Sequence, residues 1–253
     1  MFDHARAITD EPLGKSTDAI VGREIVKKKE ADFCMHDLEL ITTADGSHSL
    51  LHTSLGETYH SRHGARQESL YVFIQQGMAQ MPHPQLAVLE VGFGTGLNAW
   101  LTWQHALATG QTIRYTSLET DPLPEEIWAA LNYVSETEKP LFHALHQSPW
   151  NAWHVLDNRM MLYKWHASVL DSNIDAAAYD VIYFDAFAPN KQPELWQKSV
   201  IQKMADALVP GGVFVTYCAK GQLKRDLRTA GMVVESLPGP PGKREMVRAR
   251  KPA

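Results

Sequence analysis

Cysteine is scarce in this chain of 253 residues, which contains only Cys34 and Cys218. Two cysteines this far apart give neither a disulfide framework nor the paired spacing of a structural metal site. Each is most simply a small buried apolar residue, and such low usage favours a reducing, cytoplasmic setting. No other group of residues has a recognisable metal-ligand spacing, so no metal is expected.

Long hydrophobic runs are also missing. No apolar stretch approaches the ~20 residues of a membrane-spanning helix, so we expect no membrane association. The opening residues, MFDHARAITDEPLG, carry early acids and no apolar segment, unlike a secretory signal. Hydrophobic residues still make up 44% of the chain, which allows one large domain, or one domain with a small appendage.

Positive charge is unevenly distributed. The net charge is −5, yet residues 220–253 carry nine lysines and arginines against three acids, a local net of +6. A basic C-terminal segment on an acidic body is compatible with binding of a polyanion at one end. A solvated surface is the simpler interpretation from charge alone, so composition does not decide between the two.

The sequence changes character near residue 85. Before it, residues 38–55 contain two strand-like runs around Asp45-Gly46, which indicates a hairpin. Residues 64–81 have the periodicity of an amphipathic helix. We therefore predict an N-terminal extension over residues 1–85 and a main domain over residues 86–253.

Strand and helix patterns alternate from Leu86 onward. Strand-like runs lie at residues 86–91, 113–119, within 159–168, and at 179–185, 212–218, 232–237 and 244–250. Helical segments lie at residues 95–108, 193–208 and 221–230, and residues 124–146 form one or two helices. This alternation predicts an α/β fold whose mainly parallel sheet has helices on both faces, and a final antiparallel strand is ordinary in such a sheet. Ligands of these folds bind beyond the carboxyl ends of the strands.

A glycine-rich turn joins the first of these strands to its helix. Gly92, Gly94 and Gly96 permit a tight turn and a close approach to a ligand, and the helix N-terminus offers free N–H groups. The spacing E-x-G-x-G-x-G departs from the dinucleotide fingerprint G-x-G-x-x-G. Glu90 would repel a pyrophosphate, whereas Glu119 at the next strand end is placed to accept ribose hydroxyls. Together these features favour S-adenosyl-L-methionine, which bears a sulfonium and an ammonium, over NAD.

Four segments together resemble one known family. They are GETYHSRHGARQES (residues 56–69), EVGFGTGLNAWLTW (90–103), FDAFAPNKQPELW (184–196) and GKREM (242–246). They are similar to the methyltransferase domain of MnmC, a bifunctional tRNA-modifying enzyme, and to its free-standing counterpart MnmD. The glycine loop is generic to methyltransferases, whereas DxFAPxKxPxxW and the KREM ending are far more specific. The resemblance runs from about Leu38 to the C-terminus.

The resemblance implies a class I methyltransferase fold, Rossmann-like, with a mainly parallel seven-stranded sheet, an antiparallel last strand and an N-terminal extension covering the cofactor. It also implies S-adenosyl-L-methionine-dependent methylation of the 5-aminomethyl group of a wobble uridine, giving 5-methylaminomethyl-2-thiouridine, with the tRNA anticodon stem-loop as partner. The oxidoreductase half of MnmC has no counterpart here, so no FAD is expected and the aminomethyl substrate would be made elsewhere. The family often has an acid near the adenine, but residues 165–168 read WHAS, so that contact is left open.

Asp185 is the predicted catalytic residue, at the end of the strand 179–184. Methyl transfer to an amine needs an aligned nitrogen lone pair and a departing proton. An ordinary aspartate, with a pKa near ~3.9, is a feeble base toward an alkylammonium, although apolar neighbours raise that pKa by desolvation. We expect Asp185 chiefly to position the amine and stabilise the cationic product, with water taking the proton. The alternative is a structural cap on the following turn.

The other candidates come from the same segments. The predicted cofactor-binding residues are Glu90, Gly92, Gly94, Gly96, Asn98, Glu119, Tyr59 and Glu68. The predicted substrate-binding residues are Phe187, Lys191, His60, His63, Lys243 and Arg244. Phe187 would stack on an extruded base, although a core aromatic looks the same in sequence. The three cations would contact phosphates, and the two histidines would line the pocket or act in local structure.

Two other functions fit parts of this pattern. An aminopropyltransferase of the spermidine synthase type shares the fold and an aspartate at the same strand end, but has no reason for a basic C-terminal strand. A non-catalytic tRNA-binding protein would keep the fold as a scaffold, yet the glycine loop, Glu119 and Asp185 are all intact. Both alternatives are therefore less favoured than the methyltransferase.

Overall fold

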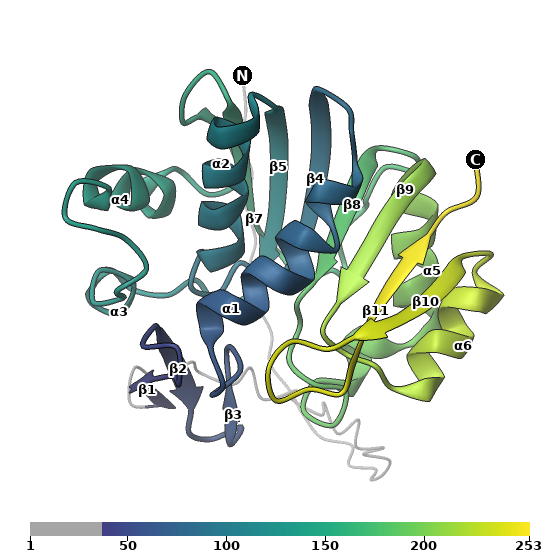
Figure 1. Ribbon diagram of the computed structural model, residues 1–253, viewed down its shortest axis with the longest axis horizontal. Helices are drawn as coiled ribbons and strands as arrows, with labels where there is room; N and C mark the ends of the chain where they lie inside the picture. The colour runs from purple at the N-terminus through teal and green to yellow at the C-terminus, as the bar shows by residue number, and fades with distance from the viewer. Residues whose placement is uncertain (1–36) are drawn as a thin grey trace, which may run out of the picture. The chain divides into compact units, whose positions relative to one another are not determined.

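An eight-stranded sheet forms the centre of the computed structural model, which describes residues 37–253 (Figure 1). Its strand order is β10-β11-β9-β8-β4-β5-β7-β6. The strands are β4 (Gln85–Val91), β5 (Thr112–Glu119), β6 (Trp153–Val155), β7 (Met160–His166), β8 (Tyr179–Phe184), β9 (Leu208–Thr216), β10 (Val233–Pro238) and β11 (Glu245–Arg250). Strands β7, β5, β4, β8 and β9 are parallel, and β11 runs antiparallel between β9 and β10. The predicted α/β class with an antiparallel last strand is confirmed.

The eighth strand, β6, was not predicted. It has three exposed residues and pairs antiparallel with β7 at the edge of the sheet. A three-residue strand is too short to show an alternating hydrophobic pattern. The expected seven-stranded sheet is therefore present with one short strand added to its edge.

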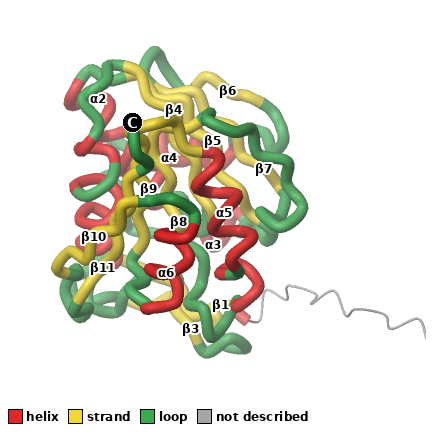
Figure 2. The backbone as a smooth tube through the Cα atoms, turned by 90° about the vertical axis from the view of Figure 1, so that its right-hand side faces the viewer, coloured by secondary structure: helices red, strands yellow, loops and turns green. Residues whose placement is uncertain are grey.

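Helices cover both faces of the sheet (Figure 2). They are α2 (Leu97–Thr109), α3 (Glu125–Trp128), α4 (Lys139–Gln147), α5 (Lys198–Ala207) and α6 (Gly221–Thr229). Successive side chains of a strand point to opposite faces, and β8 shows this directly. Its Val181 and Tyr183 join the core beneath α2, whereas Ile182 and Phe184 join the core beneath α5 and α6. Both faces are apolar, as expected for a parallel sheet buried on both sides.

The helix predicted over residues 64–81 is interrupted. It begins as α1 (Ala65–Ser69), continues as a π-helical segment (Leu70–Gln75) and ends before a 3-10 turn (Met78–Gln80). Gly77 stands at the break, where a side-chain carbon would lie 2.4 Å from the carbonyl oxygen of Phe73. The helix predicted over residues 193–208 likewise begins as a separate 3-10 turn (Pro193–Trp196), because Gln197 is extended.

The predicted hairpin is present at the start of the described residues. Strands β1 (Leu38–Thr42) and β2 (His48–His52) pair antiparallel, and β3 (Glu57–Thr58) adds to β2. At the turn, Gly46 has a φ of 81° and the Asp45 carboxylate accepts hydrogen bonds from Ser47. The chain leaves β3 directly into the predicted site residues Tyr59 and His60. The division of the chain at residue 85 stays a prediction.

Three further observations concern expectations from composition. Cys218 is a free, buried thiol, as expected, whereas Cys34 lies outside the described residues. Among residues 37–253, no helix is long and apolar enough to cross a membrane. The same residues contain no group of three or more histidine, cysteine or acidic side chains placed to hold a metal ion.

Candidate active site

A cavity of about 370 Å³ lies at the carboxyl edge of the parallel strands. Residues that follow β4, β5, β7, β8 and β9 line one side of it, and the segment after β3 lines the other. Of the predicted residues, the cavity brings together Tyr59, His60, Glu68, Gly92, Gly94, Asn98, Glu119, Asp185, Phe187 and Lys243. Glu90, Gly96, His63, Lys191 and Arg244 do not line it.

The glycine turn adopts a backbone that suits only glycine. Gly92, Gly94 and Gly96 have φ values of 96°, 48° and 72°, a region that side chains disfavour. A side-chain carbon at Gly92 would lie 2.9 Å from the carbonyl oxygen of Asp185, and one at Gly94 would lie 3.1 Å from the ring of Tyr59. The turn is therefore packed against the end of β8 on one side and the N-terminal extension on the other.

Gly96 serves the packing behind the turn. A side-chain carbon there would lie 2.7 Å from His146 Nε2. The imidazole of His146 stacks on Trp128 with 4.7 Å between ring centroids, and burial lowers its pKa to about 3. This neutral aromatic layer supports the turn from the side away from the cavity.

Glu119 reaches the turn from the end of β5. Its carboxylate accepts the backbone N–H groups of Gly94 at 2.8 Å, Thr120 at 2.8 Å and Asp121 at 2.9 Å. Burial raises the pKa of Glu119 above its ordinary value. These bonds fix the carboxylate at the cavity wall, where its remaining lone pairs are available to hydroxyl donors.

Glu90 lies in a different position from the one that its spacing suggested. It is fully buried beneath the turn, where Ser117 Oγ donates a hydrogen bond of 2.6 Å to Oε2. The other oxygen has no partner among the described residues. Burial raises the pKa of Glu90 to about 8, so the carboxyl is mainly protonated at neutral pH. It therefore supplies little negative charge to a ligand in the cavity.

Asp185 stands at the cavity wall immediately after β8. Its N–H donates to the Val91 carbonyl at 3.0 Å, and its carboxylate accepts a hydrogen bond of 2.8 Å from Asn98 Nδ2. Burial raises the pKa of Asp185 well above its usual range, and the negative charge of Glu68 adds to the rise. The site thus contains a carboxyl group that binds a proton more readily than an ordinary aspartate.

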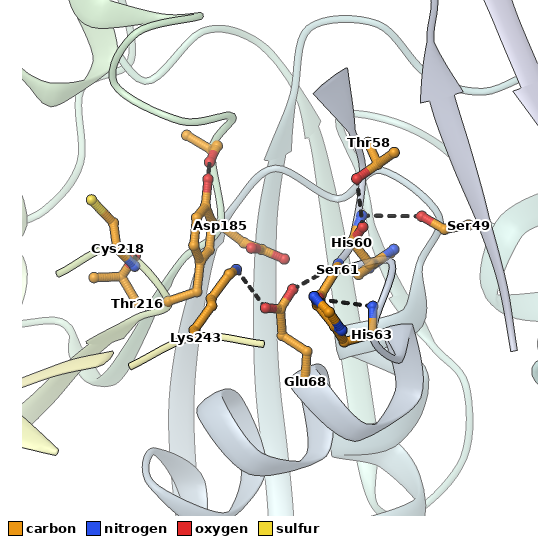
Figure 3. A network of polar contacts seen from close by, with 12 residues as sticks. Ser49, Thr58, His60, Ser61, His63, Glu68, Asp185, Thr216, Cys218 and Lys243 are labelled. Carbon is orange, nitrogen blue, oxygen red and sulfur yellow. Dashed lines mark hydrogen bonds and ion pairs between the residues drawn. The ribbon is translucent and has the colours of Figure 1, made fainter. Parts of the chain in front are cut away.

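Lys243 points into the cavity, although the sequence suggested a phosphate contact. Its ammonium pairs with the buried Glu68 carboxylate, which also accepts the Ser61 N–H at 3.0 Å (Figure 3). The same ammonium lies 3.8 Å from the ring centroid of Tyr217, a cation–π contact. The Tyr217 hydroxyl donates to the Ala186 carbonyl at 2.9 Å, which holds the ring in place.

Tyr217 is the residue of this corner that sequence reasoning missed. The pattern GVFVTYC predicts that Tyr217 lies within a strand, but β9 ends at Thr216 and Tyr217 is the first residue beyond it. Tyr217 could have been predicted as a site residue because, like Glu119 and Asp185, it lies at the end of a strand.

Phe187 and Lys191 belong to the loop after β8. Phe187 lines the cavity with its ring edge on Tyr59, at 5.1 Å between centroids, and its carbonyl accepts a hydrogen bond from Trp196. Lys191 donates a hydrogen bond of 2.6 Å to the Leu55 carbonyl. The lysine of the DxFAPxKxPxxW pattern therefore connects this loop to the N-terminal extension.

The two predicted histidines differ from each other. His60 is buried at the cavity wall, its Nδ1 has no partner among residues 37–253, and burial lowers its pKa to about 4. His63 is exposed and packs against Gly242, where a side-chain carbon would lie 1.9 Å from its Cδ2. His60 is thus a neutral wall of the cavity, and His63 packs against the turn that carries Lys243.

A second, more open hollow adjoins the cavity and shares Ala188, Tyr217 and Lys243 with it. Its rim carries Lys220 and Arg244, for which no ion pair is found among the described residues. The one acid that lines it, Glu245, pairs with Lys224 at 2.7 Å. We call this second site the basic hollow.

Comparison with known proteins agrees with this geometry. Residues 155–252 match the model of a family described as S-adenosyl-L-methionine-dependent methyltransferase. The chain is 31% identical over 208 residues to the tRNA 5-methylaminomethyl-2-thiouridine biosynthesis bifunctional protein MnmC of Chromobacterium violaceum, covering 76% of this chain and 31% of that protein. It is 32% identical over 219 residues to the protein of the same name from Pseudoalteromonas atlantica, covering 77% and 31%. The chain thus spans about a third of the length of these relatives.

A solved structure extends the likeness to the fold. The crystal structure of MnmC2 from Aquifex aeolicus matches with a TM-score of 0.70 and 26% identity, covering 85% of this chain and 72% of that one. This similarity agrees with three features of the chain: its strand order, its glycine turn and the motif after β8. The chain is thus similar to MnmC proteins and to MnmC2 over about three quarters of its length or more, and its fold is that of the class I, S-adenosyl-L-methionine-dependent methyltransferases.

Proposed function

We propose that this chain methylates the primary amine of a 5-aminomethyl group on the wobble uridine of tRNA, giving 5-methylaminomethyl-2-thiouridine. The methyl donor is S-adenosyl-L-methionine, the RNA partner is the anticodon stem-loop, and neither FAD nor a metal takes part. We place the reaction in the cytoplasm. One observation carries the proposal: a single cavity joins the glycine turn and Glu119 to the cluster of Asp185, Glu68 and Lys243.

The residues present fit the cofactor. Gly92 and Gly94 bring bare backbone to the cavity where any side chain would collide, and Glu119 offers a carboxylate to ribose hydroxyls. Asn98 Oδ1 is buried at the cavity wall without a partner among the described residues. When bound, S-adenosyl-L-methionine supplies an electrophilic methyl group whose bond to sulfur breaks as the bond to nitrogen forms.

Asp185 orients the substrate amine and accepts a proton from it. Its carboxylate accepts an N–H of the amine and so orients the lone pair. The raised pKa of Asp185 narrows its gap to the pKa of an alkylammonium, which makes it a better proton acceptor than an ordinary aspartate. The hydrogen bond from Asn98 keeps the carboxylate facing the cavity throughout.

The outer parts of the site suit a nucleic acid. Phe187 presents an aromatic ring at the cavity wall, where an extruded base can pack. The basic hollow lies directly beside the cavity, and its Lys220 and Arg244 are placed to contact the phosphates that flank such a base. No feature of residues 37–253 favours the aminopropyltransferase or the non-catalytic alternative.

The direct test uses tRNA from cells that lack this gene. The purified protein is incubated with that tRNA and with S-adenosyl-L-methionine labelled in the methyl group, and the RNA is then digested to nucleosides. We expect 5-aminomethyl-2-thiouridine to disappear as labelled 5-methylaminomethyl-2-thiouridine forms. Absence of label from the RNA, or label in another nucleoside, would contradict the proposal.

A further inference from the structure

Lys243 is held inside the cavity by its local backbone. The turn before β11 is closed by hydrogen bonds from the Lys243 N–H to the Pro240 carbonyl, 2.9 Å, and from the Gly239 N–H to the Arg244 carbonyl, 3.1 Å. Gly242, with a φ of 82°, leaves room for His63. These contacts point the Lys243 side chain at Glu68 and Tyr217, so its side chain is only 28% exposed.

The charges around Lys243 are few. Glu68 on α1 pairs with it, Asp185 follows β8, and Tyr217 and Cys218 follow β9. Burial raises the pKa of Tyr217 and of Cys218, and burial lowers the pKa of His60 to about 4, so all three are neutral at pH 7. Among the described residues, Glu68, Asp185 and Lys243 are the charged groups inside this corner, while Glu57, Lys220 and Lys224 also act on Tyr217 or Cys218.

Two carboxylates beside an amine substrate favour its protonated form, which cannot react. The nitrogen must be neutral to attack the methyl group, yet an alkylammonium has a pKa near ~10.4 in water. Each nearby carboxylate stabilises the ammonium and raises that pKa further. A site with Glu68 and Asp185 alone would bind the substrate well and hold it in the unreactive, protonated form.

We propose that Lys243 is a positioning residue that lowers the pKa of the bound substrate amine. Its ammonium neutralises Glu68 and repels the substrate ammonium, which then passes its proton to Asp185 and attacks as the neutral amine. Lys243 stays charged in its ion pair, and the cation–π contact with Tyr217 keeps it from swinging toward solvent. This inference rests on the proposed function and adds how the nucleophile is generated.

The test measures the pKa of the bound amine without turnover. An anticodon stem-loop carrying 5-aminomethyluridine labelled with ¹³C at the aminomethyl carbon is bound to the protein without cofactor, and the carbon shift is followed against pH. We expect the pKa of the bound amine to rise by about 1 unit or more in Lys243→Met. Lys243→Arg keeps the charge and should stay close to the wild type.

The double variant Lys243→Met with Glu68→Gln makes the test specific. Removing both charges should return the pKa of the bound amine toward the wild-type value, and the rising limb of kcat against pH, which reports groups in the enzyme–substrate complex, should follow the same order. A merely structural role for Lys243 predicts lower activity with an unmoved limb and no rescue in the double variant, which would overturn the inference. Because Glu68 and Lys243 both line the cavity, circular dichroism and thermal unfolding, rather than cofactor affinity, show that each variant is folded.

The two proposals fail in different ways. If wild-type protein methylates the aminomethyl group but Lys243→Met leaves the pKa of the bound amine and the pH profile unchanged, the inference alone is wrong. If wild-type protein transfers no methyl group to that tRNA, the proposed function is wrong and the inference falls with it.

Discussion

The cavity and the basic hollow share Tyr217 and Lys243 but treat charge in opposite ways. In the cavity, charges are buried and paired: Lys243 with Glu68, and Asp185 with the amide of Asn98. In the basic hollow, Lys220 and Arg244 lie at the surface with no ion pair among residues 37–253. Burial makes each charge in the cavity decisive for protonation, whereas surface charges mainly attract a polyanion and are screened by salt. The cavity is therefore suited to the chemical step, and the adjoining basic hollow is suited to docking of the RNA.

The largest effect is expected at Asp185. Asp185→Asn keeps the size of the side chain and an oxygen for the Asn98 hydrogen bond, but removes the charge and the proton acceptor. The rate of methyl transfer should fall by roughly 10²- to 10⁴-fold, while S-adenosyl-L-methionine affinity stays within about twofold of the wild type. Single-turnover kinetics and calorimetry measure the two quantities separately. Normal turnover in this variant would remove Asp185 from the mechanism.

The next effect contrasts two acids beside the glycine turn. Glu119→Gln weakens a charged acceptor at the cavity wall, and hydrogen bonds to charged groups contribute roughly 1.5–3 kcal/mol, so cofactor affinity should fall about 10- to 100-fold. Glu90→Gln is the matched control, because Glu90 is buried beneath the turn and does not line the cavity. Its cofactor affinity should change by less than about threefold. Equal losses in both variants would show that Glu90 acts on the ligand after all.

Glu90 also makes a prediction about stability against pH. Its pKa is raised by burial to about 8, whereas an unfolded glutamate has an ordinary pKa near 4.5. Between these values unfolding releases a proton, so the folded state loses stability as pH rises, on the order of 1 kcal/mol per pH unit. The free energy of unfolding in urea should therefore fall more between pH 5.5 and pH 7 in the wild-type protein than in Glu90→Gln. Parallel curves for the two proteins would mean that Glu90 is ionised in the fold.

Sequence patterns predicted the parts of this site that depend on neighbouring residues. The alternation of strands and helices placed Glu119 and Asp185 at strand ends, and the glycine spacing marked the turn between β4 and α2. The class of fold and the hairpin at Asp45 also followed from local patterns. Each of these features depends on residues that are close together in the sequence.

What the sequence did not predict depends on contacts across the chain. Lys243 and Glu68 are 175 positions apart, so no local pattern shows that a lysine in a basic segment turns inward to a buried acid. The protonation of Glu90 likewise depends on a contact across the chain, because the carboxyl is buried against β5, where Ser117 donates a hydrogen bond to it. Lys191 was expected to be free for phosphate, yet its partner is a carbonyl in the N-terminal extension. Tertiary burial, which decides charge state, is the information that local patterns lack.

The smallest effect concerns the basic hollow and tests whether docking is separate from chemistry. Lys220→Ala combined with Arg244→Ala should weaken binding of an anticodon stem-loop and lower the slope of log affinity against log salt by about 0.7 for each lost phosphate contact. Lys198→Ala with Arg228→Ala removes the same charge from exposed positions outside both sites, and should leave the slope nearly unchanged. The pH limb of kcat should not move in either variant, because Lys220 and Arg244 do not line the cavity. If the two double variants change the slope equally, the net charge of the protein steers the RNA and the basic hollow is not its docking site.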